Sequence, residues 1–191
     1  GDSLSSGRDG NVTPLERLEK IIADCQPGSI LTIDARRRVS SGLATLAQGT
    51  VVAFAKNSDQ VTGLYYDGRD KNLPLLPLVM DFIDPTPSRG LQSHLCIAAA
   101  ERLKCDMVLA FGLMDRMMER SLRFDQILDG LAQFAKRQLV VDFLPPKGDP
   151  KLEACSGYQN ENFINALGKK FRKISRCSGY AGGAALLLCE K

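Results

Sequence analysis

The sequence lacks the features that mark several classes of protein. None of its apolar runs approaches the roughly 18 residues that a membrane-spanning helix needs. The formal net charge is only +3 at pH 7, with 25 basic and 22 acidic residues. A balance this close to neutral is no strong signal for nucleic-acid binding or for a membrane surface. We therefore expect no membrane partner, and the charge alone favours no nucleic acid.

Metal-ligating residues are also scarce. The chain has a single histidine, His94, and six cysteines that are scattered without any C-x-x-C pair. This spacing argues against a zinc site and against a compact disulfide framework. Free cysteines are typical of a reducing compartment. We therefore predict no bound metal and a cytoplasmic location.

The composition is that of an ordinary globular domain. Hydrophobic residues make up 44% of the 191 residues and charged residues 25%, which is enough apolar material for one full core. Residues 1–12 are polar and glycine-rich and lack the apolar segment of a signal peptide. We expect them to be a disordered tail or a remnant left by cutting a longer protein, with the domain at 13–191.

Strand and helix patterns alternate along the chain. The sequence predicts strands at 29–33, 50–54, 75–80, 107–113, 139–144, 171–176 and 184–189. It predicts helices at 15–22, 40–48, 57–68, 91–103, 121–136 and 160–169. Alternation of this kind implies right-handed βαβ units and a parallel sheet. The two closely spaced strands at the end could form an antiparallel edge.

Open sheets of this class bind their ligands at the carboxyl ends of the strands, near the point where the strand order reverses. Functional residues are therefore expected just after Ile33, Phe54, Met80, Gly112 and Leu144.

Four segments resemble a known family. They are LLPLVMDFIDPTP at 75–87 followed by Gly90, DMVLAFGL at 106–113, QLVVDFL at 138–144 followed by Asp149 and Pro150, and YQNENF at 158–163. In this order they are similar to the third-strand, fourth-strand, fifth-strand and following segments of the nodulation-protein-type methyltransferases. The resemblance covers roughly residues 28–190. It implies the class I fold of S-adenosylmethionine-dependent methyltransferases: a Rossmann-like seven-stranded sheet, mostly parallel, with helices on both faces and an antiparallel last strand.

The departures from that family fall on the residues that hold the cofactor. The glycine-rich turn expected after the first strand is replaced by DARRRVSSG at 34–42, with one late glycine. The acid expected after the second strand is replaced by Ala55 and Lys56, and the paired histidines expected after the fourth by Asp115 and Arg116. Asp81, which follows the third strand, matches the family.

The strand ends and the resemblance together predict the site. The candidate cofactor-binding residues are Asp34, Arg36, Ala55, Lys56, Asp81, Phe82, Phe111 and Gly112. Asp81 has an alternative role as the cap of its own turn, because aspartate commonly bonds the backbone two residues on. Asp115 is the candidate catalytic base, and its alternative role is a surface carboxylate paired with Arg116.

Three functions are compatible with these residues. The first is a methyltransferase-like domain that uses S-adenosylmethionine on a small-molecule or unknown acceptor, with cofactor binding weakened or lost. The second is a non-catalytic descendant of the fold that binds a protein partner or flanking domains. The third is a binder of another anionic small molecule through 36–38 and Lys56.

Overall fold

The computed structural model of the chain describes residues 14–33, 37–90, 96–145, 157–177 and 185–191. Within them the centre of the molecule is a seven-stranded sheet with the order β3-β2-β1-β4-β5-β7-β6. The strands are β1 (Ser29–Ile33), β2 (Thr50–Ala55), β3 (Leu75–Val79), β4 (Cys105–Ala110), β5 (Ala135–Phe143), β6 (Lys173–Cys177) and β7 (Ala185–Glu190). The first five strands are parallel to one another, and β7 is antiparallel to both β5 and β6. The predicted fold class is confirmed.

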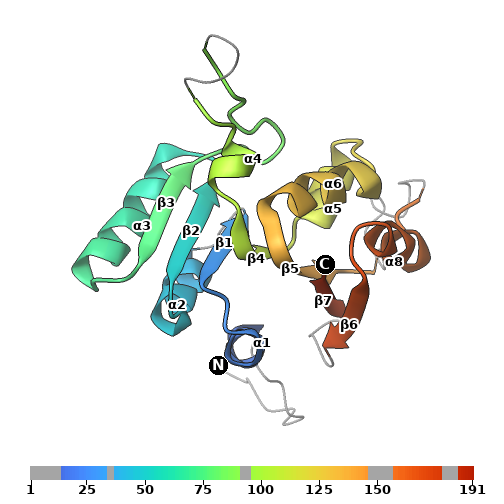
Figure 1. Ribbon diagram of the computed structural model, residues 1–191, viewed down its shortest axis with the longest axis horizontal. Helices are drawn as coiled ribbons and strands as arrows, with labels where there is room; N and C mark the ends of the chain where they lie inside the picture. Colours follow the sequence, from blue (N-terminus) through green and yellow to red (C-terminus); the bar gives the residue numbers. More distant parts are fainter. Residues whose placement is uncertain (1–13, 34–36, 91–95, 146–156, 178–184) are drawn as a thin grey trace, which may run out of the picture.

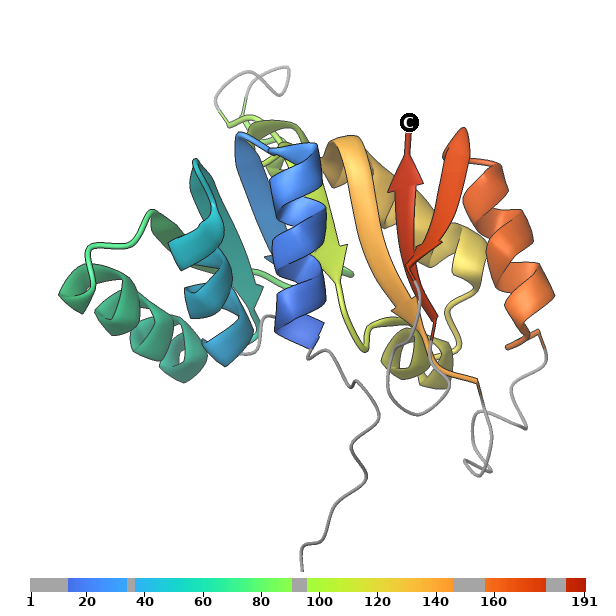
Figure 2. The same ribbon diagram turned by 90° about the horizontal axis from the view of Figure 1, so that it is seen from below.

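Helices cover both faces of this sheet (Figures 1 and 2). On one face lie α1 (Pro14–Cys25), α2 (Arg37–Leu46) and α3 (Ser58–Asp70). On the other lie α4 (Ala99–Arg102), α5 (Met114–Glu119), α6 (Phe124–Phe134) and α8 (Asn160–Gly168). The sheet therefore separates two hydrophobic cores.

The strand sequences show why both cores form. In β4, Met107 and Leu109 pack with α1 and α2, whereas Val108 and Ala110 pack with α5, α6 and α8. Alternate residues of a strand point to opposite faces, so a strand that is covered on both faces must be apolar throughout. The unbroken apolar run that predicted this strand thus reflects its central position.

The edge strands differ from the central ones. β3 lies at one edge, where Pro77 is paired with Ala53 of β2. Proline lacks the N–H that a second neighbour would need, so it is tolerated at an edge and not in the middle of a sheet. The edge position of β3 therefore accommodates this proline.

Two predicted helices have different bounds, and one helix was not predicted. The helix expected over 91–103 is reduced in the described residues to α4, because Ala98 is extended and the Ala99 N–H bonds Thr86 O at 2.8 Å. Cys96 instead forms an isolated antiparallel bridge with Arg89, and 91–95, with His94, lies outside the described residues. The helix expected to reach 136 ends at Phe134, since Ala135 already pairs with β4. The short helix α5 was not predicted.

Candidate functional site

The carboxyl ends of the parallel strands meet at one edge of the sheet, the lower edge in Figure 2. β1 pairs with β2 on one side and with β4 on the other, so the strand order reverses at β1. Ligand crevices of open α/β sheets form outside such a reversal point. The candidate site residues described below lie at the ends of β2, β3, β4 and β5 or just after them, at or near this edge.

Beyond β1, the basic turn is partly used by the fold itself. Asp34 and Arg36 lie outside the described residues. Arg37 begins α2 and forms a two-point ion pair with Asp67 of α3, Nε to Oδ2 at 2.7 Å and Nη2 to Oδ1 at 2.6 Å. Ser41 donates a third hydrogen bond to Asp67 at 3.1 Å. The hydrogen bonds from Arg37 hold the pKa of Asp67 at about 2, and the Arg37 guanidinium is committed to joining α2 and α3.

At the end of β2 the structure gives no carboxylate. Ala55 is buried in the strand, and Lys56 is exposed directly after it. Asn57 then accepts the Gln60 N–H at 2.9 Å and caps α3. Lys56 therefore brings positive charge to this edge.

After β3, the two predicted residues have structural contacts of their own. Asp81 is exposed, and its Oδ1 accepts the Ile83 N–H at 3.0 Å, which is the turn-capping role considered for it. The ring of Phe82 packs 6.4 Å from the Phe134 ring and lies under α6, where a Cβ added to Gly130 would come within 2.9 Å of it. Phe82 therefore anchors the loop after β3 on α6.

The turn after β4 is fixed from two sides. The Gly112 N–H donates to Asp142 Oδ1 at 2.8 Å, and Arg116 Nε donates to Gly112 O at 2.5 Å. Gly112 has a φ of 55°, and a Cβ built on it would meet no atom within 4 Å. Residues other than glycine are strained at this φ. The chain thus presents bare backbone to open space beside Phe111, which is itself partly exposed.

Two carboxyl groups lie beside this turn. Asp142 in β5 is 4% exposed, and burial, together with the nearby charge of Asp115, raises its pKa to about 6. Asp115 lies in the first turn of α5, and its buried Oδ1 accepts no hydrogen bond from the residues that the structure describes. The alternative role of Asp115, a surface carboxylate paired with Arg116, stays a prediction. The sequence analysis missed Asp142, although an acid within the apolar run LVVDF was a visible signal.

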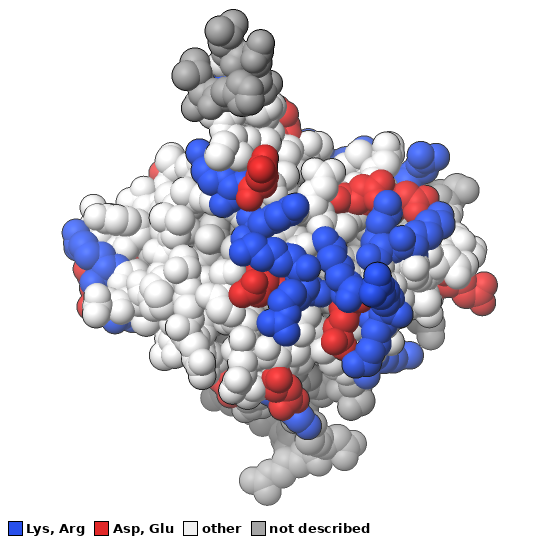
Figure 3. Space-filling view, viewed as in Figure 1, with Lys and Arg blue, Asp and Glu red and all other residues white. Residues whose placement is uncertain are grey.

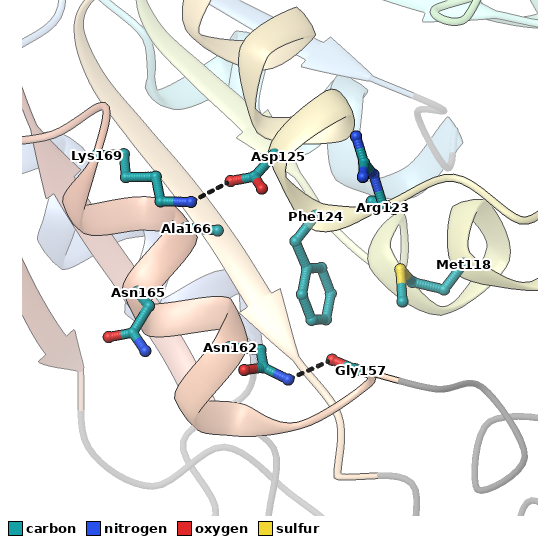
Figure 4. A pocket seen from close by; sticks show the side chains of 9 residues that line it. All are labelled: Met118, Arg123, Phe124, Asp125, Gly157, Asn162, Asn165, Ala166 and Lys169. Carbon is teal, nitrogen blue, oxygen red and sulfur yellow. Dashed lines mark hydrogen bonds and ion pairs between the residues drawn. The ribbon is translucent and has the colours of Figure 1, made fainter.

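A groove lies between α6 and α8, on the face of the sheet that also carries α5 (Figure 4). Its cavity is about 550 Å³, and its floor is formed by Met118, Phe124 and Ala166, all buried. The polar side chains around it are Arg123, Asp125, Asn162, Asn165 and Lys169, with an ion pair of 3.1 Å between Lys169 and Asp125. Met118 follows Asp115 by one turn of α5, and Phe143, which packs against Phe124, follows Asp142.

The structure thus brings Phe111, Gly112, Asp115 and Asp142 together at the end of β4, with Ala55 and Lys56 at the end of β2 on the same edge. Among the described residues, no three His, Cys, Asp or Glu side chains are grouped so that they could hold a metal ion. No helix in the same part of the chain has both the length and the apolar character needed to cross a bilayer.

Comparison with known proteins gives results for structure only. No protein-family model matches the sequence, and no curated protein matches it. Magnesium protoporphyrin IX methyltransferase from Synechocystis PCC 6803, solved with bound S-adenosylhomocysteine, has a TM-score of 0.62 and 15% identity over 96% of this chain and 89% of that one.

Two further neighbours have the same architecture. A TehB-like S-adenosylmethionine-dependent methyltransferase from Corynebacterium glutamicum has a TM-score of 0.59 and 12% identity over 95% of this chain and 90% of that one. TehB from Haemophilus influenzae has a TM-score of 0.61 and 16% identity, covering 90% of this chain and 60% of that one. Identities this low establish the fold alone. From its strand order and these neighbours, the chain has the class I S-adenosylmethionine-dependent methyltransferase fold.

Proposed function

We propose that the chain binds S-adenosylmethionine at the carboxyl edge of β1, β2 and β4 and transfers its methyl group to a small-molecule acceptor. The observation that supports this most is the Gly112 turn, whose backbone borders open space next to two carboxyl groups at the reversal point of the sheet. A Cβ would occupy that space, so the turn fits a bound cofactor. The proposal also agrees with the bound S-adenosylhomocysteine of the Synechocystis neighbour.

The cofactor, when bound, supplies an activated methyl group that passes to the acceptor by in-line displacement. The chain has to place the acceptor and remove its proton. Asp115 is the proposed base, because its buried Oδ1 has no hydrogen-bond donor among the described residues. The acceptor proton moves to this carboxylate. Asp142 holds the Gly112 turn in place through the hydrogen bond to its N–H.

The groove between α6 and α8 is the proposed site for the rest of the acceptor. Its volume of about 550 Å³ is within the usual range for small-molecule pockets, which combine an apolar lining with a few polar groups. It is one helical turn from Asp115 through Met118. An acceptor with an apolar body and hydrogen-bonding groups at its ends suits this lining (Figure 4).

The first test is thermal unfolding with and without S-adenosylhomocysteine. A ligand at about 100 times its dissociation constant adds roughly 2.7 kcal/mol, which raises the midpoint of a domain of this size by about 5–10 °C. We expect the wild type to show this rise and Gly112→Val to lose it. Gly168→Val is the matched control, since a Cβ on Gly168, at the end of α8, also meets no atom within 4 Å.

Two results would contradict parts of the proposal. No rise for the wild type with millimolar S-adenosylhomocysteine would remove cofactor binding. A rise with inorganic phosphate alone would then favour the second candidate, an anionic ligand at Lys56, which stands where the family has an acid. Asp115→Asn should keep the rise and slow methyl transfer to acceptors in a metabolite extract by about 10²–10⁴-fold. Unchanged transfer would remove Asp115 as the base.

A further inference from the structure

Basic side chains line the edge of the sheet opposite the candidate site. This is the upper edge in Figure 2, which faces the viewer in Figures 1 and 3. At this edge β4, β5 and β6 begin, and the antiparallel strand β7 ends. We call six residues the basic row: Arg102, Lys104, Lys136, Arg137, Arg172 and Lys191.

Sheet topology explains why residues so far apart in sequence gather. Lys104 precedes β4, Lys136 and Arg137 open β5, Lys191 follows β7, and Arg172 precedes β6. The strand order β4-β5-β7-β6 therefore sets the order of the cations along the edge. Figure 3 shows the resulting band of basic side chains across this face of the molecule.

The row keeps an excess of positive charge because three of the acids near it are paired with other lysines. Lys169, Lys170 and Lys173 form ion pairs with Asp125, Asp129 and Glu190. The side chains of Arg102, Lys104, Lys136, Arg137 and Arg172 are exposed and form no ion pair within the described part of the chain. Three nearby acids form no ion pair in the described part either: Glu101 is exposed beside Arg102, Asp24 lies with Arg137 near Cys25, and Asp106 lies with Lys136 near Cys105. The row thus has five such cations against three unpaired acids.

Two cations of the row lie close to each other. Lys191 Nζ donates to Ala132 O at 2.7 Å and to Ala135 O at 2.5 Å, which holds it at the junction of α6 and β5. Burial and the nearby charge of Lys104 lower the pKa of Lys191. Like charges held close together repel, and an anion bound between them would relieve the repulsion.

The dimensions of the row suit a phosphate backbone. Neighbouring strands are about 4.8 Å apart, so four strands extend over about 14 Å. This length corresponds to about four successive phosphates of one strand of a duplex at ~3.4 Å each along the axis. Exposed aromatic rings suitable for stacking on bases lie elsewhere: Tyr65 and Tyr66 are on α3, beside the distant edge strand β3. The chemistry of the row thus favours phosphate contact without base recognition.

We propose that the basic row docks the phosphate backbone of a double-stranded nucleic acid, independently of its sequence, on the edge opposite the methyl-transfer site. The nucleic acid is then a docking partner of the domain and not the acceptor. This inference does not depend on the proposed function.

Fluorescence anisotropy with a labelled DNA duplex of about 20 base pairs tests this at salt concentrations from about 50 to 200 mM. Each phosphate contact contributes about 0.9 to the slope of log affinity against log salt, so five contacts predict a slope of about −4.5. The triple variant Lys104→Gln, Lys136→Gln, Arg137→Gln should reduce the slope by about 2.7 and weaken binding about tenfold or more at the lowest salt.

The matched control removes the same charge elsewhere. The control is a second triple variant, Lys20→Gln, Lys71→Gln, Arg120→Gln. These exposed cations lie on α1, between α3 and β3, and after α5, respectively. This variant should leave the slope unchanged. Equal losses in the two triple variants would overturn the proposal, because binding would then reflect net charge. It would also be overturned by no wild-type binding at about 50 mM salt, or by polyglutamate binding more tightly than the duplex, which would assign the row to an acidic protein.

Discussion

Asp142 is an acid whose nearest neighbours along β5, residues 139–141 and 143, are all apolar. It couples the candidate site to the stability of the fold. Its pKa is about 6, raised from 3.8 mainly by burial and further by Asp115, while the hydrogen bond from Gly112 opposes the rise. The folded protein therefore binds a proton here between about pH 4 and 6 that the unfolded chain does not. The contribution of Asp142 to stability is full below pH 4 and is lost as the pH rises through 6.

Asp142→Asn should remove this dependence, because the amide stays neutral and its oxygen can still accept the Gly112 N–H. A shift of about 2 pKa units corresponds to roughly 3 kcal/mol. We expect the variant to be more stable than the wild type by up to that amount at pH 7.5, and equal to it near pH 4. Urea unfolding across this range measures both curves. If the free energies of unfolding of wild type and variant differ by the same amount at every pH, the raised pKa of Asp142 is contradicted. The control is Asp129→Asn, which changes an exposed acid paired with Lys170.

Single residues differ in how far the sequence could predict them. The turn-capping role of Asp81 follows from local chemistry and was foreseen as an alternative. The contacts of Phe82 with α6 and of Arg37 with α3 join segments about 50 and 30 residues apart, which no local pattern reveals. The pairing of Asp142 with Gly112 also requires β4 and β5 to be neighbours.

At the level of elements, central strands were the easiest to predict, since burial on both faces requires an unbroken apolar run. Helix ends were harder, because a tertiary contact decides them: Ala135 leaves α6 to pair with Cys105 of β4. A tertiary contact also explains why the helix predicted over 91–103 is shorter in the structure. The Ala99 N–H donates to Thr86 O at a position where that helix was expected to continue.

The turns before β1 and β2 make a testable close contact. A Cβ added to Gly49 would lie 1.8 Å from Gly28 O, and both positions are backbone next to paired strands. Gly49→Ala should therefore shift the strands and destabilise the protein by roughly 1–3 kcal/mol. Gly168→Ala, where a Cβ meets nothing within 4 Å at the end of α8, should be neutral or slightly stabilising. Urea unfolding compares the two, and equal effects would contradict the close contact.

For the whole molecule, the sheet should open from its edges. β1, β4 and β5 are almost fully buried between two layers of helices, whereas β3 and β6 are edge strands with exposed residues. Local opening costs least where few apolar contacts are lost. Amide hydrogen exchange should therefore be slowest in β1, β4 and the second half of β5, and fastest in β3 and β6. Protection of β3 equal to that of β4 would contradict this order.

The fold as a whole was predictable because alternation, strand length and the family resemblance all indicated the same sheet. The surfaces were not. The groove of Figure 4 joins residues of three helices, and the basic row joins cations that are up to 89 positions apart, from Arg102 to Lys191. A net charge of +3 averages over the whole surface and so conceals the concentration of basic side chains along a single edge.

The position of β7 between β5 and β6 has a consequence for how the protein is made. During synthesis β6 emerges before β7, yet it reaches the sheet only by pairing with β7. Until that hairpin closes, the outer backbone of β5 is an unpaired template that any other extended chain can join. Substitutions in the β6–β7 hairpin should therefore lower the yield of folded protein and increase aggregation during synthesis. These effects should appear at substitutions that leave the thermal unfolding midpoint of the folded domain unchanged.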